Sequence, residues 1–188
     1  RRVTRTWVRF ITRGYPVWMA SVYAVVVSSA IGRVRFSFDS QGCLQRVDLC
    51  VRAALGCRGL PPQGTPDSAS LEKWLSHYFA GSTTSFPGRW QILTGSAFRK
   101  SVYQTVVDIP MGQTMTYGEV AVMCGSPGAA RAVGSAMAQN PIPLVVPCHR
   151  VLAANGLGGF TSPSGVKLKI ELLAFEARPS LSSVRTKV

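Results

Sequence analysis

The spacing of apolar residues changes along this chain, and that change limits the folds it can adopt. In residues 17–50, short apolar runs alternate with turn residues, and residues 34–38 and 44–49 flank the turn sequence 39–42 in the manner of a β-hairpin. From residue 71 onward, apolar residues recur at the spacing of amphipathic helices. We therefore expect an α/β (α+β) fold, in which a small N-terminal module with an antiparallel sheet and a helix precedes a mainly helical C-terminal domain.

Composition divides the chain into four parts. Residues 56–70 are rich in Pro and Gly and indicate a loop or linker, and a second loop is expected before residue 96. We predict a basic arm over 1–16, the N-terminal module with its linker over 17–95, the C-terminal domain over 96–178, and a tail over 179–188.

The N-terminal residues leave two interpretations. Five arginines fall within residues 1–13, and they precede an uncharged run over 14–32 that has about the length of a membrane anchor. Pro16 and several serines interrupt that run, and the β-branched sequence 25–27 favours a strand. We expect a basic arm followed by a strand, and no association with a membrane.

The C-terminal half predicts two short consecutive helices. Thr116 and Glu119 match a capping box, so a helix should occupy residues 117–125. Ser126 is expected to be the N-cap of a second helix that runs to about residue 139, with the proline that follows Ser126 at its first position. Two helices joined so tightly form a candidate helix-turn-helix.

The second of these helices has an unusual composition. Small residues surround its one cation, Arg131, and they are Gly128, Ala129, Ala130, Ala132, Gly134, Ser135 and Ala136. Such a helix either packs tightly in a core or places a smooth face in a nucleic-acid groove. Lys and Arg number 21 against 8 Asp and Glu, and the net charge of +13 favours a polyanionic partner, either nucleic acid or an anionic membrane.

The five cysteines indicate free thiols, since their number is odd and no C-x-x-C pair occurs. Cys43, Cys50 and Cys57 recur every seven residues, but the chain has only two histidines, so we expect buried thiols here and no structural metal. A reducing compartment fits this composition.

Cys148 and His149 are adjacent in the tetrad that follows the apolar run 144–146, which we expect to be a short buried strand or extended segment. A thiol becomes a strong nucleophile only as a thiolate, and an imidazole can supply the base or the positive charge that this requires. Sequence neighbours usually point apart, so a water or a turn should connect the two side chains. A free buried Cys beside a structural His is the alternative.

Four ordered blocks carry a resemblance to a known family. They are IPMGQTMTYGEVA at 109–121, SPGAARAVGSAMAQNPIPLVV at 126–146, PCHRV at 147–151 and GVKLKIELLAFE at 165–176. Together they resemble the O6-alkylguanine-DNA alkyltransferases, densely over residues 96–177, while residues 17–95 resemble that family only in pattern. The resemblance implies DNA repair by stoichiometric alkyl transfer from double-stranded DNA, without a cofactor, by a monomer. It also implies a nuclear location in a eukaryote and a cytoplasmic, nucleoid-associated one in a prokaryote.

The resemblance implies roles for four catalytic residues. Cys148 would attack the alkyl carbon, and His149 would take the thiol proton through a water. Glu176 would hold the imidazole and favour its charged form. Tyr117 would face the DNA phosphate and donate a hydrogen bond to the flipped guanine. The alternatives are a solvated carboxylate for Glu176 and a half-buried residue of a helix cap for Tyr117.

The resemblance also implies the DNA-binding and pocket residues. Arg131 would fill the gap left by the extruded nucleotide, and Ala129, Ala130, Gly134 and Ser135 would let the helix enter the minor groove. Asn140 would tie the helix pair to the active-site segment. Val151, Gly159, Phe160 and Thr161 would line the base pocket, and Arg150 is expected to be structural. The family's usual Gly-Tyr is replaced here by Gly159-Phe160, so we expect an altered substrate preference.

Two other functions compete with alkyl transfer. A catalytically silent alkyltransferase-like protein would bind the lesion and recruit other factors, but the retained Cys148 argues against it. A Cys-dependent hydrolase would need an oxyanion hole and a third triad partner, and no motif for either stands out.

Overall fold

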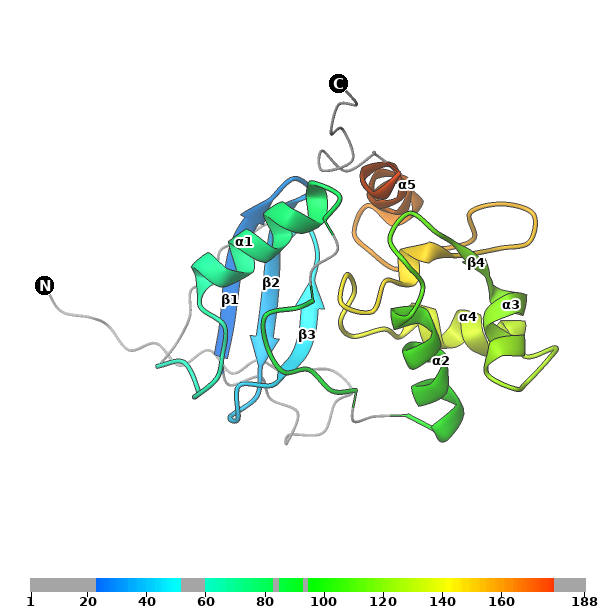
Figure 1. Cartoon of the computed structure of the whole chain (residues 1–188), viewed down its shortest axis with the longest axis horizontal. Helices are drawn as coiled ribbons and strands as arrows, with labels where there is room; N and C mark the ends of the chain where they lie inside the picture. The colour runs from blue at the N-terminus through cyan, green and yellow to red at the C-terminus, as the bar shows by residue number, and fades with distance from the viewer. Residues whose placement is uncertain (1–22, 52–59, 83–84, 93–94, 178–188) are drawn as a thin grey trace, which may run out of the picture.

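The computed structural model describes residues 23–51, 60–82, 85–92 and 95–177. Its N-terminal part is a three-stranded antiparallel sheet with the strand order β1-β2-β3, built from β1 (Tyr23–Ser29), β2 (Gly32–Phe38) and β3 (Leu44–Asp48) (Figure 1). The predicted hairpin over 34–49 is confirmed, and so is the strand at 25–27. The basic arm over 1–16 and the tail over 179–188 lie outside the described residues.

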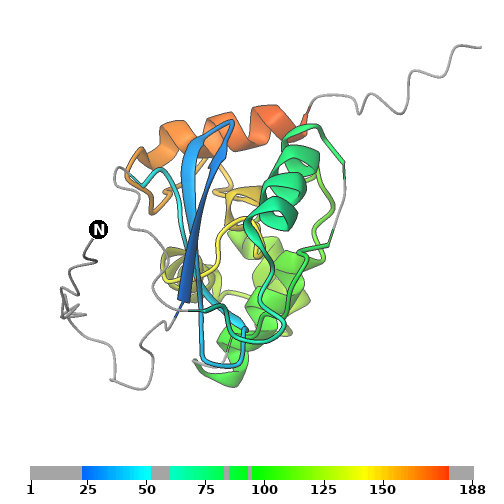
Figure 2. The same ribbon diagram turned by 90° about the vertical axis from the view of Figure 1, so that its left-hand side faces the viewer.

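Helix α1 (Ser68–Phe79) lies against one face of this sheet (Figure 2). The helix begins where the side chain of Asp67 accepts a 2.7 Å hydrogen bond from the Ser70 amide, which is an N-cap. Trp74 packs edge-on against Phe36 of the sheet, with ring centroids 6.1 Å apart. None of the helices in the described ranges combines the length and the apolar character that crossing a bilayer requires.

The second part is mainly helical, as predicted. Its elements are α2 (Ala97–Val107), β4 (Met115–Thr116), α3 (Tyr117–Met123), α4 (Ala130–Ala138), a 3-10 turn (Cys148–Arg150), β5 (Val151–Leu152) and α5 (Gly165–Glu176). The short strands β4 and β5 pair in parallel, which brings the start of α3 beside the segment that follows the 3-10 turn. The mixed α/β fold is therefore confirmed.

The helix-turn-helix of α3 and α4 is present, but its connection differs from the prediction. The capping box is formed: the Glu119 amide donates to Thr116 Oγ1, and the Thr116 amide donates to the Glu119 carboxylate. The expected N-cap at Ser126 is wrong, because α4 begins only at Ala130. Gly128 has a φ of +88°, which a right-handed helix does not allow, so the residues before it belong to the connection.

A Schellman motif ends α3. The Ser126 amide donates to the carbonyl of Ala121 and the Gly125 amide to that of Val122, both at 2.9 Å. Gly125 has a φ of +68°, the left-handed conformation that this motif needs.

The segment 144–146 is a turn, so the prediction of a strand or extended segment there is wrong. Leu144 has a φ of +73°, and the Val146 amide donates to the carbonyl of Ile142 at 2.9 Å. Asn140 organises this turn, because its side chain donates to the Val146 carbonyl at 2.8 Å and accepts from the Ile142 amide at 3.1 Å. These bonds occupy the backbone groups that a strand would have used for pairing. Leu144 and Val146 are nevertheless buried.

The two parts are joined by direct contacts. The Val47 amide of β3 donates to the carbonyl of Pro141 at 2.8 Å. Phe79 at the end of α1 packs edge-on against Phe175 of α5, with ring centroids 5.0 Å apart. The sheet and α1 fall within the predicted N-terminal module (17–95), and the later elements fall within the predicted C-terminal domain (96–178). The exact domain boundaries stay a prediction.

The backbone conformations of two glycines in and after α3 predict opposite effects of substitution by alanine. Gly125→Ala should destabilise the protein by about 1–2 kcal/mol, because an L-residue is strained at its positive φ. Gly118→Ala should stabilise it by up to about 1 kcal/mol, because Gly118 is an exposed helical residue whose added Cβ would meet only Thr116 Oγ1 at 3.8 Å. Urea unfolding of both variants measures the difference, and equal effects would contradict the motif as the cause.

Candidate active site

Cys148 opens the 3-10 turn that follows the segment held by Asn140. Its side chain is buried, with 7% of the residue exposed. All three residues of the turn are buried, so Cys148 and its neighbour His149 both lie in the interior although successive side chains of a 3-10 turn point in different directions. Both residues lie in one 3-10 turn, and the connection between their side chains stays a prediction.

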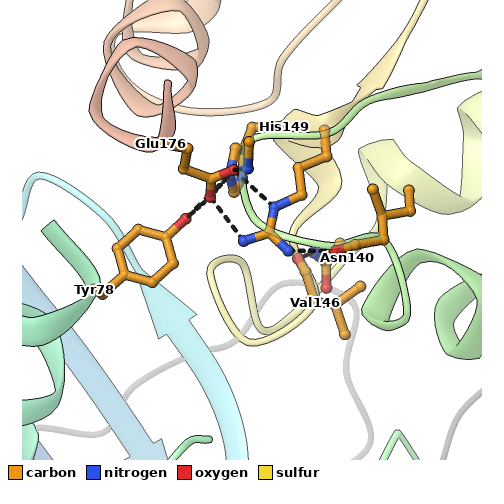
Figure 3. A network of polar contacts seen from close by, with 8 residues as sticks. Tyr78, Asn140, Val146, His149 and Glu176 are labelled. Atoms are coloured by element: carbon orange, nitrogen blue, oxygen red, sulfur yellow. Dashed lines mark hydrogen bonds and ion pairs between the residues drawn. The ribbon is translucent and has the colours of Figure 1, made fainter. Parts of the chain in front are cut away.

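His149 is completely buried beside the carboxylate of Glu176 (Figure 3). The distance from His149 Nε2 to Glu176 Oε1 is 2.8 Å. A carboxylate accepts hydrogen bonds, so Nε2 carries the proton and Nδ1 is left as the acceptor. In the described part of the chain, Nδ1 has no hydrogen-bond partner. The imidazole is therefore held by one nitrogen and free to take a proton at the other.

Two further residues bind the same carboxylate. Arg150 donates from Nε to Oε2 of Glu176 at 2.9 Å and from Nη2 to Oε1 at 2.8 Å, and its Nη1 donates to the carbonyl of Ile109. This geometry fits the structural role expected for Arg150. Tyr78 of α1 donates its hydroxyl to Oε1 at 2.5 Å. The network thus draws on α1, the 3-10 turn and α5.

Burial governs the protonation of this network. Burial alone would raise the pKa of Glu176, but the hydrogen bonds from His149, Arg150 and Tyr78 hold it well below its ordinary value. Burial lowers the pKa of His149, and Glu176 opposes that change without reversing it. Glu176 thus favours the charged imidazole, as expected, but burial has the larger effect on the pKa of His149. The imidazole is neutral at rest.

The thiol is also neutral at rest. Burial raises the pKa of Cys148, against a hydrogen bond from Asn140 and the positive charge of Lys169, which both lower it. A thiol and an imidazole that are both neutral can act as a nucleophile and its general base once a proton path joins them. The thiolate forms when the proton is taken up.

Lys169 was missed by the sequence interpretation. It is fully buried in α5, and its ammonium donates to the carbonyls of Val151 at 2.7 Å, Leu157 at 2.5 Å and Gly159 at 3.4 Å. Its ammonium thus fixes the loop after β5. The signal was present in the sequence, since Lys169 lies three residues before Leu172, on the apolar stripe of the helix.

Tyr117 begins α3 and is half-buried between two glycines. A Cβ added to Gly158 would lie 3.1 Å from the Tyr117 hydroxyl, and one added to Gly134 would lie 4.0 Å from its ring. Lys169 Nζ lies 6.0 Å from the ring centroid. Burial, and then the charge of Cys148, raise the pKa of Tyr117. The structure therefore brings Tyr117, Cys148 and Lys169 into one electrostatic neighbourhood.

The remaining pocket and DNA-binding candidates lie at α4, in β5 and in the loop that follows β5. Val151 is buried, Phe160 is half-buried against the core, and Gly159 and Thr161 are exposed in the loop that Lys169 holds. On α4, Arg131 and Ser135 are exposed, while Ala129, Ala130 and Gly134 are half-buried. The exposed face of α4 thus carries one long cation among small side chains. Within the described residues, no cluster of three His, Cys, Asp or Glu side chains suits a metal ion, and Cys57 lies outside them.

Comparisons with known proteins identify this arrangement. Residues 97–178 match the family model described as 6-O-methylguanine DNA methyltransferase, DNA binding domain. A methylated-DNA–protein-cysteine methyltransferase of Mycobacterium leprae is 45% identical over 126 residues, covering 66% of this chain and 73% of the relative. One from Methanosarcina acetivorans is 37% identical over 164 residues, covering 82% of this chain and 98% of the relative.

A solved structure agrees with these sequences. The crystal structure of Mycobacterium tuberculosis OGT in complex with DNA is similar with a TM-score of 0.65 and 33% identity, covering 82% of this chain and 92% of that one. The likeness extends over both the sheet module and the helical part. The chain therefore belongs to the methylated-DNA–protein-cysteine methyltransferase family.

Proposed function

We propose that this protein repairs DNA by transferring the alkyl group of O6-alkylguanine in double-stranded DNA to Cys148, once per molecule. The observation that carries the proposal is the buried Cys148-His149 pair, held by Glu176 beside a helix-turn-helix in a member of this family. The chemistry calls for no cofactor. The proposed location follows the DNA: the nucleus in a eukaryote, and the nucleoid in a prokaryote.

The proposed reaction is a substitution at the alkyl carbon. A bond forms between Cys148 Sγ and that carbon while the carbon–O6 bond breaks, and the electron pair of the broken bond stays on guanine. The thiol proton passes through a water to His149 Nδ1, and the departing guanine takes a proton from the Tyr117 hydroxyl, so that it leaves as a neutral base. A proton then returns from His149 to Tyr117. The net reaction exchanges the thiol hydrogen for the alkyl group.

The product explains why each molecule acts once. A thioether has no acyl carbon for water to attack, so the alkyl group stays on Cys148. A Cys-dependent hydrolase would release its product and turn over. A silent lesion-binding relative needs no nucleophile, and the presence of Cys148, with His149 of the same turn held by Glu176, disfavours that alternative.

DNA would be bound through α4. A base inside a duplex must be flipped out to reach a buried thiol, and Arg131, which is exposed on α4, would fill the gap. The small residues around it would let the helix approach the minor groove, and the net charge of +13 suits binding through phosphates that weakens with salt. We expect the protein to act as a monomer, with a backbone N–H of the loop at 158–161 meeting guanine O6.

Intact-mass analysis separates the three functions. Wild-type protein incubated with O6-methylguanine duplex should gain one methyl group, located on Cys148, and Cys148→Ala should bind the duplex without gaining mass. Cys124→Ala is the matched control, since Cys124 is a half-buried free thiol beside Thr105, and it should still be methylated. Repeated demethylation without a mass change would indicate a hydrolase, and binding alone a silent relative.

Phe160 should shift the substrate preference. Phe160→Tyr restores the hydroxyl that the family usually has at this position, so the ratio of transfer rates for methyl and benzyl adducts should differ between wild type and variant. Single-turnover rates on both adducts measure this ratio. Indistinguishable ratios would reject a role for the missing hydroxyl.

Arg131→Ala should slow transfer from duplex DNA roughly tenfold or more, because the flipped state loses a stabilising contact. Transfer from the free base O6-benzylguanine needs no flipping and should be unchanged. Lys167→Ala removes an equal charge from the exposed face of α5 and is the control. Equal losses on duplex and free base would show that Arg131 acts through the fold instead.

A further inference from the structure

Tyr78 belongs to the sheet module, yet its hydroxyl lies in the catalytic network. It comes from the last turn of α1, and only 4% of the residue is exposed. Its oxygen is 2.5 Å from Glu176 Oε1 and 3.1 Å from His149 Nε2. Figure 3 shows the ring pointing from α1 toward Glu176. The residue is 98 positions from Glu176 in sequence.

We propose that Tyr78 is a positioning residue for alkyl transfer, whose hydroxyl shares the Glu176 carboxylate with His149 and so keeps the imidazole neutral with Nδ1 free to accept the thiol proton. This inference rests on the proposed function. It makes the N-terminal module a contributor to the chemistry as well as a scaffold.

Competition at one oxygen supports this role. Glu176 Oε1 is within hydrogen-bond distance of three donors, Tyr78, His149 and Arg150, although a carboxylate oxygen offers only about two lone pairs. Burial and the charge of Glu176 raise the pKa of Tyr78 well above its ordinary value, so its hydroxyl stays a donor. Each donor draws on the same negative charge. The hydroxyl therefore weakens the hold of Glu176 on the imidazole proton.

The charged groups around His149 give the sign of the effect. Glu176 raises the pKa of His149, while Arg150 and Lys169 lower it, and Cys148 is its neutral neighbour in the turn. Removing the Tyr78 hydroxyl leaves Glu176 with one donor fewer, so the pKa of His149 should rise. A base must be neutral to accept a proton. The acid limb of the rate profile should then move to higher pH.

The hydroxyl can be removed without removing the packing. The Tyr78 ring contacts Trp74 and Phe79, with centroids 5.9 Å and 5.2 Å away, and phenylalanine keeps both contacts. Tyr103 offers a matched control, because its buried hydroxyl donates to the carbonyl of Ala136 at 2.9 Å. Both substitutions remove one buried hydroxyl, but only one of them touches Glu176.

The first experiment is the pH dependence of single-turnover methyl transfer for wild type, Tyr78→Phe and Tyr103→Phe. In Tyr78→Phe the midpoint of the acid limb should move up by roughly one pH unit, the size expected for one hydrogen bond to a charged group. At pH values below both midpoints, the rate of Tyr78→Phe should be roughly tenfold lower than that of wild type. In Tyr103→Phe the midpoint should stay at the wild-type value, even if the loss of this hydrogen bond lowers the free energy of unfolding.

The second experiment needs no transfer. Nitrogen NMR of labelled histidine resolves the two imidazoles of the chain, and His77 is exposed on α1. His149 should show the Nε2–H tautomer in wild type and a higher titration midpoint in Tyr78→Phe. Unmoved midpoints in both experiments would overturn the inference. Absence of transfer in wild type would instead overturn the proposed function, while the imidazole titration would still decide the role of Tyr78.

Discussion

The buried carboxylate of Glu176 is the interaction on which the site depends. An ionised carboxylate removed from water is costly unless donors surround it, and here the donors come from distant segments. Tyr78 approaches from α1, His149 and Arg150 from the 3-10 turn, and the Gly112 amide from the loop before β4. Satisfying this one charge therefore fixes the end of α5 against the turn that carries Cys148. The same contacts hold the sheet module to the helical part.

The site holds the Cys148 thiol in its neutral form. Burial disfavours charge on both Cys148 and His149, and a protonated thiol is a weak nucleophile. Asn140 and Lys169 act in the other direction and lower the cost of forming the thiolate. Lys169 itself is an ammonium bound by backbone carbonyls, so a thiolate at Cys148 would be a favourable neighbour for it. The thiolate is thereby less costly to form than burial alone would make it.

Small residues serve the same site in a different way. Tyr117 fits against the loop after β5 because Gly158 presents no side chain to its ring. Gly158 also has a φ of +68°, which favours glycine on conformational grounds. Gly134 of α4 also faces this ring, and a Cβ added there would make ordinary van der Waals contact with it at 4.0 Å. The packing of Tyr117 thus joins α3, α4 and the loop after β5.

Features that arise from interactions over a few residues could be predicted from the sequence. The hairpin, the capping box at Thr116 and the left-handed end of α3 at Gly125 follow from steric preferences and local hydrogen bonds. The ordered motif blocks pointed to Cys148, His149 and Glu176. Local reasoning failed at Ser126 and at 144–146, where a glycine conformation and the side chain of Asn140 prevailed. In the sequence, Tyr78 and Lys169 lie on the apolar stripes of their helices and look like ordinary core positions. Their polar partners became visible only in the folded chain. A buried hydroxyl or ammonium bonds to whichever distant groups packing brings to it, and no local pattern in the sequence specifies those groups.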